Sequence, residues 1–233
     1  MSRDSHEARD GSRVATGAAA EPPQPFAPAL ALEGLLPLYD PILRAVIPEE
    51  AIKRQLVTLS RIATGHRVLD LGCGTATLTL YIKEMHRDAD VVGLDPDAKA
   101  LERAAQKAAA ADLAIGFDVG SATALPYVDG SLDRVLSAFV FHHLSRDEKR
   151  ATFREVLRVL KPGGTFGLLD FGRPPTALGR LLSPLLHPGR HARDNVRGRL
   201  PELLREAGFP DVREAARRTL VVGSVSHWIC GKP

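Results

Sequence analysis

The chain has 233 residues, of which 44% are hydrophobic and 25% charged, so it is long enough for one globular domain with additions. Its formal net charge of +3, with basic and acidic residues interleaved, gives little support for a nucleic-acid partner. Two distant cysteines, Cys73 and Cys230, indicate neither a disulfide framework nor a zinc site. No apolar run approaches the roughly 20 residues of a membrane span. We therefore expect a cytoplasmic protein without a metal and without stable membrane insertion.

The N-terminal region predicts a tail followed by a helical cap. Residues 1–27 contain almost no large apolar side chains, so we expect a disordered tail. Residues 28–65 are expected to form the cap. Their first half is Leu-rich but is interrupted by Pro37 and Pro41, whereas residues 48–65 read as a clear helix that begins at Pro48 and stops at Gly65.

From residue 66 to 233, short apolar runs alternate with helical patterns, which predicts one α/β domain. Five runs are expected to be strands: 67–71, 90–95, 114–120, 132–140 and 165–171. Such alternation is typical of a Rossmann-like, mostly parallel sheet with helices on both faces. After an irregular insertion at about 173–197 and a helix over 199–209, the runs 211–222 and 224–231 predict a C-terminal antiparallel hairpin, giving seven strands.

The helix predicted over residues 145–160 has clear boundaries. Ser145 and Glu148 have the spacing of a capping box, in which each residue bonds the backbone N–H of the other. The sequence "KPGG" that follows is expected to end the helix.

The first strand-to-helix connection, "DLGCGT" at 70–75, is the first candidate site, because parallel sheets bind ligands at the C-terminal ends of their strands. Gly72 and Gly74 let the backbone turn sharply, and the next helix offers unpaired N–H groups to an anion. Asp70 would repel a pyrophosphate but attract an ammonium group. An amino-acid zwitterion satisfies both features, with its carboxylate on the amides and its ammonium beside Asp70.

A second acid, Asp95, ends the second strand about 20 residues after the glycines, at the spacing of a carboxylate that binds ribose hydroxyls. Asp95 also suits the N-cap of the following helix, and the two roles are compatible. A zwitterion together with a ribose describes S-adenosylmethionine.

Four ordered motifs carry a resemblance to a known family: "VLDLGCGTATL", "GLDPD", "GSATALPYVDGSLDRVLSAFVFHHL" and "LKPGG". They resemble the class I S-adenosylmethionine-dependent methyltransferases, and within them the branch of ubiquinone and menaquinone biosynthesis. The resemblance covers roughly residues 39–171 and implies a Rossmann-like methyltransferase that uses S-adenosylmethionine as its cofactor.

The resemblance also implies which residues surround the cofactor. Its sulfonium would lie near Tyr39, its methionine end near the first loop, its ribose at Asp95 and its adenine beside Pro96. The full expected set is Tyr39, Asp70, Gly72, Cys73, Gly74, Asp95, Pro96, Ser121, Ala122 and Phe139. Two positions depart from the family pattern. Ala76 stands where a third glycine is common, which tightens the loop, and Ser121 stands where an acid is common, which weakens the adenine contact.

Candidate catalytic residues follow the fourth strand. His142 or His143 is positioned to remove a proton from an acceptor. The resemblance favours the alternative, in which one ring packs beneath the loop and the other bonds the backbone. A general base is not required if the acceptor is already nucleophilic. Cys73 is interpreted as a small loop filler rather than a reactive thiol, because Asp70 opposes thiolate formation.

The acceptor is less defined by the sequence. Apolar segments at 30–47 and 173–188 flank the motifs, which favours a small organic or lipid-like acceptor. Residues 177–193 fit one wall of the acceptor pocket or a peripheral membrane contact. A nicotinamide-dependent oxidoreductase and a non-catalytic adenosyl-binding protein are the alternative functions for this fold. The sequence does not indicate an oligomeric state.

Overall fold

The computed structural model describes residues 48–177, 180, 190–220 and 223–233, all within one compact unit, Pro37–Pro233. The expected tail at 1–27 and the first half of the expected cap, 28–47, lie outside the described residues. The helices are α2 Glu49–Leu59, α3 Thr77–Met85, α4 Ala98–Ala110, α5 Arg146–Val159, α7 Arg193–Val196 and α8 Leu200–Glu206, with short 3-10 helices η1 Phe141–His143 and η2 Arg190–Ala192. The strands are β1 Arg67–Leu71, β2 Asp90–Asp95, β3 Gly116–Val119, β4 Leu132–Ala138, β5 Leu160–Phe171, β6 Asp211–Leu220 and β7 Gly223–Gly231.

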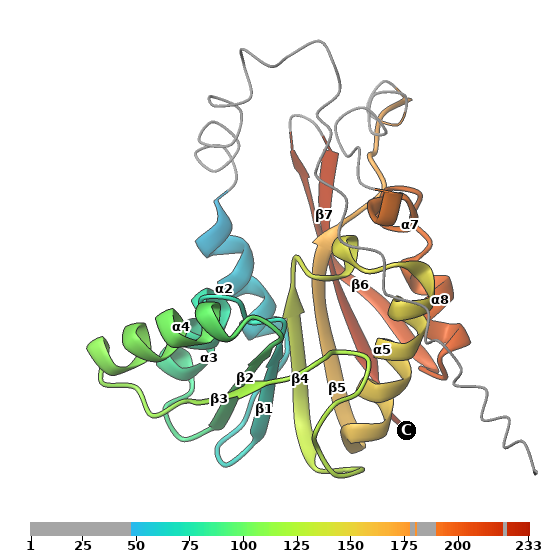
Figure 1. Ribbon diagram of the computed structural model, residues 1–233. Helices are drawn as coiled ribbons and strands as arrows, with labels where there is room; N and C mark the ends of the chain where they lie inside the picture. Colours follow the sequence, from blue (N-terminus) through green and yellow to red (C-terminus); the bar gives the residue numbers. More distant parts are fainter. Residues whose placement is uncertain (1–47, 178–179, 181–189, 221–222) are drawn as a thin grey trace, which may run out of the picture. The chain divides into compact units, whose positions relative to one another are not determined.

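The strands form one sheet in the order β3-β2-β1-β4-β5-β7-β6 (Figure 1). Strands β1 to β5 are mutually parallel, whereas β7 is antiparallel to both of its neighbours, β5 and β6. The predicted mostly parallel sheet with a C-terminal antiparallel hairpin is therefore confirmed. The register places Ser226 of β7 opposite Asp170 at the end of β5.

Helices bury their apolar stripes on both faces of the sheet, as predicted. On one face, Ile52 and Leu56 of α2 and Ile82 of α3 belong to one buried cluster. On the other face, Phe153 of α5 and Leu204 of α8 belong to a second. Because these side chains are fully buried, each contributes roughly 1.5–3 kcal/mol of transfer free energy. None of the helices in the described part is long and apolar enough to span a bilayer.

Helix α2 ends earlier than predicted, at Leu59 rather than near Gly65. The Ser60 hydroxyl donates to the carbonyl of Leu56 at 2.8 Å, and Arg61 adopts a left-handed φ of 47°. The Arg134 guanidinium of β4 donates to the carbonyls of Ser60 and Arg61. A residue distant in sequence thus satisfies the carbonyls at this helix end, which the local pattern does not reveal.

Two strand boundaries also differ from the prediction. Strand β4 stops at Ala138 rather than at residue 140, because Phe139 has a φ of 59°, which an extended strand cannot contain. Strand β5 begins at Leu160, directly after α5 ends at Val159, and the residues of "KPGG" bulge out of its pairing with β4. Leu160 pairs with Leu132, and the next pair is Arg134 with Thr165, so the extra residues at this register shift lie in β5. The capping box of α5 is present as predicted.

Candidate active site

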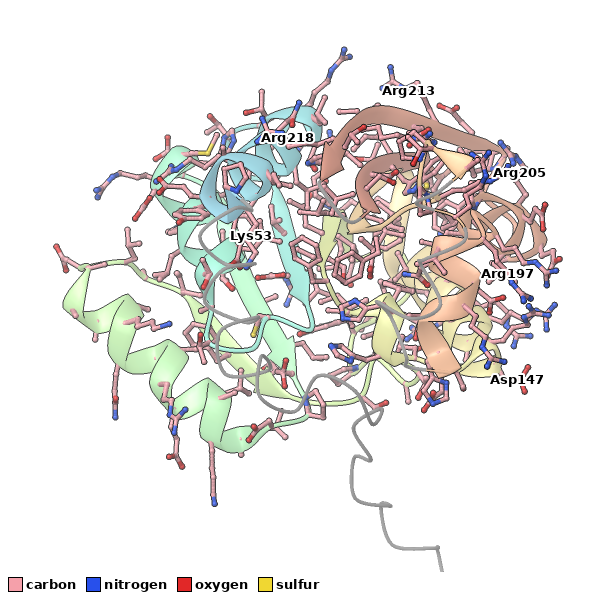
Figure 2. All side chains as sticks on the ribbon, turned by 90° about the horizontal axis from the view of Figure 1, so that it is seen from above. Lys53, Asp147, Arg197, Arg205, Arg213 and Arg218 are labelled. Atoms are coloured by element: carbon pink, nitrogen blue, oxygen red, sulfur yellow. The ribbon has the colours of Figure 1, made fainter. Side chains whose placement is uncertain are left out.

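The C-terminal ends of the parallel strands bring the predicted site residues to one edge of the sheet. The glycine loop follows β1, Asp95 ends β2, Phe139 and η1 follow β4, and Asp170 lies near the end of β5. Figure 2 looks onto this edge. Segments up to about 100 residues apart in the sequence therefore meet where open parallel sheets bind ligands.

The loop after β1 requires its two glycines for different reasons. Gly72 has a φ of 74°, and a β-carbon there would overlap the Cγ2 atom of Val140. Gly74 has a φ of 52°, but a β-carbon there would meet nothing within 4 Å. Gly72 is thus needed for backbone conformation and close packing, whereas Gly74 borders open space.

Ala76 also lies in the left-handed region, with a φ of 66°, at the N-cap of α3. This conformation explains why a glycine suits the position, since a β-carbon there costs roughly 1–2 kcal/mol. The loop nevertheless adopts this conformation with alanine, whereas the expected tightening of the loop stays a prediction.

Asp70 is buried and faces α3. Its side chain is 1% exposed, and its Oδ2 atom accepts a 2.6 Å hydrogen bond from Thr79 Oγ1. Burial raises the pKa of Asp70 to about 6, and the hydrogen bonds from the Thr79 hydroxyl and backbone N–H oppose this shift. One carboxylate oxygen is therefore already bonded to a hydroxyl of α3, so the effect of Asp70 on a ligand's ammonium group would be through space.

Asp95 joins the first loop to the second. Its Oδ2 atom accepts from the Gly74 N–H at 2.8 Å, and its Oδ1 atom accepts from the Asp97 N–H at 3.0 Å. The N-cap of α4 is Asp97, which accepts from the N–H groups of Lys99 and Ala100. The capping role considered for Asp95 is therefore wrong, and its partly exposed carboxylate is held beside the open space at Gly74.

Cys73 packs as a small residue within the loop. Its side chain is 9% exposed, and its Sγ atom occupies the space that a β-carbon on Gly93 would need. Burial raises the pKa of the Cys73 thiol, and the charges of Asp70 and Asp95 act in the same direction. These observations agree with a filler rather than a nucleophile. No group of three or more potential metal ligands occurs among the residues that the structure describes.

The residues expected around the adenine lie after β2 and β3. The Ser121 hydroxyl is 2.8 Å from Thr123 Oγ1 and accepts from the Thr123 N–H, while Pro96 is exposed. Ala122 packs against the core cluster of α5 and α8. Tyr39 lies outside the described residues. The contacts of these residues with an adenine stay predictions.

His142 is oriented by a buried carboxylate. Its Nδ1 atom is 3.0 Å from Asp170 Oδ1, and Asp170 is fully buried. Asp170 also accepts from the backbone N–H groups of His142 and Phe171. Because a carboxylate accepts hydrogen bonds, Nδ1 carries the proton in this pair and Nε2 is left to accept one. The arrangement is that of a positioned general base.

His143 has a different environment. Its ring centroid is 3.9 Å from that of His142, but it is exposed, and none of the described carboxylates is paired with it as Asp170 is with His142. Partial desolvation and the neighbouring His142 lower the pKa of His143. Two aromatic rings border the histidines: Phe171 lies edge-on to His142 at 4.8 Å and tilted to Phe139 at 5.6 Å. Only His142 of the two has the geometry of an oriented base.

Asp170 was not among the residues predicted from the sequence. Its signal was present, because "TFGLLDF" places an acid at the end of a predicted parallel strand, as Asp70 and Asp95 are placed in β1 and β2. The pairing with His142 depends on the β4–β5 register and on the turn at Phe139, which the sequence does not reveal.

Comparison with known proteins decides the family. Residues 68–164 match a family profile described as a methyltransferase domain. An uncharacterised methyltransferase of Synechocystis is 35% identical over 158 residues, covering 66% of this chain and 71% of the relative. The chain belongs to the class I S-adenosylmethionine-dependent methyltransferases.

Other members of the family show how far this likeness extends. Demethylmenaquinone methyltransferase of Thermus thermophilus is 40% identical over 123 residues, which cover 53% of this chain and 55% of the relative. The chain thus spans about half the length of the curated relatives it matches first. A phosphoethanolamine N-methyltransferase of Haemonchus contortus, solved with S-adenosyl-L-methionine, has a TM-score of 0.64 at 16% identity and covers 78% of this chain and 52% of its own. That likeness concerns the fold.

The loop geometry fits the cofactor of this methyltransferase family. The open space at Gly74 lies beside the Asp95 carboxylate, whose oxygens can accept from ribose hydroxyls. The buried Asp70 supplies negative charge near the same loop. Described residues of the predicted set thus offer both space and suitable acceptors for S-adenosylmethionine.

Proposed function

We propose that this chain transfers a methyl group from S-adenosylmethionine to a hydroxyl group, or to an adjacent carbon activated by it, on a small organic or lipid-like acceptor. The observation that carries the proposal is the His142–Asp170 pair. It lies at the ends of β4 and β5, and the residue after Phe139, Val140, packs directly against the glycine loop.

The donor half of the site would be held by the loops after β1 and β2. Asp95 would accept from the ribose hydroxyls, and the loop around Gly74 would lie along the amino-acid part. When bound, S-adenosylmethionine supplies a methyl group on a positively charged sulfur, a leaving group that needs no protonation. The chain therefore has only to hold, align and activate the acceptor.

The acceptor half requires a proton to move. His142 Nε2 would take the hydroxyl proton, so that an O–H bond breaks, an N–H bond forms, and the oxygen becomes nucleophilic. Asp170 would hold the ring orientation through Nδ1 and stabilise the imidazolium that results. This arrangement is useful for a neutral hydroxyl group and unnecessary for an unprotonated amine.

The surroundings of His142 support an apolar acceptor. Phe139 and Phe171 border the pair, and aromatic side chains favour flat or hydrocarbon-like groups. A relative named demethylmenaquinone methyltransferase agrees with this chemistry, whereas the phosphoethanolamine enzyme represents the competing amine acceptor. Family membership gives no support to the nicotinamide-dependent or non-catalytic alternatives.

A transfer assay tests the proposal. Purified protein is incubated with methyl-labelled S-adenosylmethionine and a panel of phenols, reduced quinones, aliphatic alcohols and amines. We expect label in a hydroxyl-bearing apolar acceptor. His142→Ala and Asp170→Asn should each lower kcat by about 10²–10⁴-fold without weakening donor binding, whereas the neighbouring variant His143→Ala should change kcat little.

The acidity of the acceptor provides the sharper readout. A nitrophenol that is already ionised at the assay pH needs no base, so the defect of His142→Ala should largely disappear with it. Transfer to amines alone, or a defect of the same size for ionised and neutral acceptors, would contradict the role of His142.

A further inference from the structure

The segment formed by η2 and α7 is fastened to the first turns of α5. Asp194 accepts two hydrogen bonds from the Arg146 guanidinium, and its side chain is only 10% exposed. The ammonium group of Lys149, which is fully buried, donates to the carbonyl of His191 at 2.6 Å. An ion pair and a hydrogen bond from a buried cation therefore hold this segment in place.

The same segment lies at the end of the sheet that carries the His142–Asp170 pair. Helix α7 contacts η1, which contains His142, and it also contacts β5, which carries Asp170. Figure 1 shows α7 at the C-terminal end of β5. Because α7 packs against these elements, a buried side chain of α7 points toward them.

Asn195 of α7 is such a side chain, and its amide has no partner. The residue is 1% exposed, and neither Nδ2 nor Oδ1 forms a hydrogen bond within the described part of the chain. A buried amide in this state has lost its bonds to water without replacement, so such groups are rare in native proteins. Among the described residues, Asn195 is the one side chain in which both a donor and an acceptor are left unpaired.

A second buried polar group without a partner lies beside Asp170. Ser226 of β7 pairs with Asp170 in the sheet register, is fully buried, and its hydroxyl forms no hydrogen bond to any described residue. Paired residues of antiparallel strands point to the same face of a sheet. Unpaired polar groups thus come from two elements that adjoin the strand end carrying Asp170, α7 and β7.

We propose that Asn195 binds a neutral hydroxyl or carbonyl oxygen of the methyl acceptor, other than the oxygen that is methylated. Its carboxamide offers N–H donors and a carbonyl acceptor but no charge to balance a phosphate or an ammonium group. One such group in an otherwise apolar pocket fixes the orientation of a ligand. The inference rests on the proposed function, because it concerns the same acceptor, and it narrows the acceptor to molecules with two oxygen-containing groups.

Matched pairs of acceptors test this inference. Each of the three dihydroxybenzenes is compared, without air, with the methylphenol of the same substitution pattern, so that a methyl group of similar size replaces one hydroxyl. For at least one pattern, the wild type should show a kcat/KM per hydroxyl group about tenfold or more higher for the dihydroxybenzene, because the methylphenol leaves the buried amide unpaired.

The variants locate the source of this preference. In Asn195→Leu the preference should disappear, since the variant has no amide to pair. Thr165→Val removes another buried hydroxyl without a partner, on the part of β5 away from this edge, and should keep the preference. If thermal unfolding shows that Asn195→Leu does not fold, Asn195→Ala, which introduces no larger group, decides by the same ratio.

Three results would overturn the assignment. The first is a wild type that methylates the methylphenols as well as the dihydroxybenzenes in every pattern. The second is a folded Asn195 variant that loses activity equally with both acceptors and keeps their ratio, which is the result of a purely structural role. The third is transfer to none of these phenols, which contradicts the proposed function itself, and the assignment of Asn195 then fails with it.

Discussion

Single residues in the first loop hold the backbone in conformations that only glycine adopts without strain. Gly72 and Gly74 both have a positive φ, but only Gly72 lies against a neighbour, Val140. Gly65 resembles Gly74, because it has a φ of 75° and a β-carbon there would meet nothing within 4 Å. Substitutions at these three glycines therefore distinguish the effect of backbone strain from the effects of packing and of ligand binding.

Gly72→Ala should be the most destabilising of the three substitutions. It carries the left-handed strain of roughly 1–2 kcal/mol and an overpacking cost of about 1–3 kcal/mol against Val140. Gly65→Ala should lose only the strain. Denaturant unfolding monitored by circular dichroism measures both, and an equal loss for the two variants would show that the contact with Val140 does not matter.

Gly74→Ala should resemble Gly65→Ala in stability but differ in binding. Its new methyl group points into the space that the donor is proposed to fill, so affinity for S-adenosylhomocysteine should fall at least about tenfold, equivalent to about 1.4 kcal/mol. Gly65→Ala should bind like the wild type. Unchanged affinity in Gly74→Ala, measured by calorimetry, would show that the donor does not bind at this loop.

At the scale of elements, the capping box at the start of α5 fixes the segment that carries the histidines. Ser145 Oγ accepts from the Glu148 N–H, and Glu148 Oε2 accepts from the Ser145 N–H at 2.7 Å. Since η1 ends two residues before the helix, the cap limits how far His142 can move.

Ser145→Ala should therefore destabilise the protein by about 0.5–2 kcal/mol. Glu148→Gln should lose less, because an amide oxygen can still accept from the Ser145 N–H. Urea unfolding of the two variants checks this order. A larger loss in Glu148→Gln would mean that the charge of Glu148 matters more than the cap.

Strand β7 contains a buried histidine that connects the sheet to α2. His227 is fully buried, its Nε2 atom is 2.9 Å from the carbonyl of Ile52, and burial lowers its pKa. The unfolded chain therefore binds a proton that the folded chain resists, so this histidine contributes stability above about pH 6.5 that is lost as the pH falls.

When the pH is lowered from 7.5 to 5.5, the free energy of unfolding of His227→Gln should fall by less than that of the wild type. Asp70, whose pKa burial raises to about 6, acts in the opposite direction, but it does so in both proteins and the comparison removes it. The measurement is the free energy of unfolding at the two pH values. An identical loss in the two proteins would show that His227 does not titrate with unfolding.

At the scale of the whole molecule, the order of elements was readable because buried parallel strands and amphipathic helices differ in period. The residues at which the helices and strands end were not readable from the sequence. Helix α2 stops at Leu59 because Arg134 of β4 binds the carbonyls beyond it, and β5 extends back to Leu160 because that residue pairs with Leu132. Both causes are contacts between segments that are far apart in the sequence.

The candidate site divides in the same way. The positions of Gly72, Gly74 and Asp95 at the ends of β1 and β2 were predictable because strand and loop patterns are local, whereas their roles in binding stay predictions. Asp170 was not predicted, since its pairing with His142 depends on strand register. The expectation for Tyr39 lies outside the described residues.

Binding of S-adenosylmethionine at the edge of the sheet formed by β1 and β2 is tested most directly by one titration. S-adenosylmethionine, S-adenosylhomocysteine and NAD are added in turn to the wild type and to Asp95→Asn, with thermal unfolding as a check on folding. We predict micromolar binding of the two adenosyl ligands, no binding of NAD, and a loss of about tenfold or more in the folded variant. Binding of NAD alone, or adenosyl binding that Asp95→Asn leaves unchanged, would contradict this assignment.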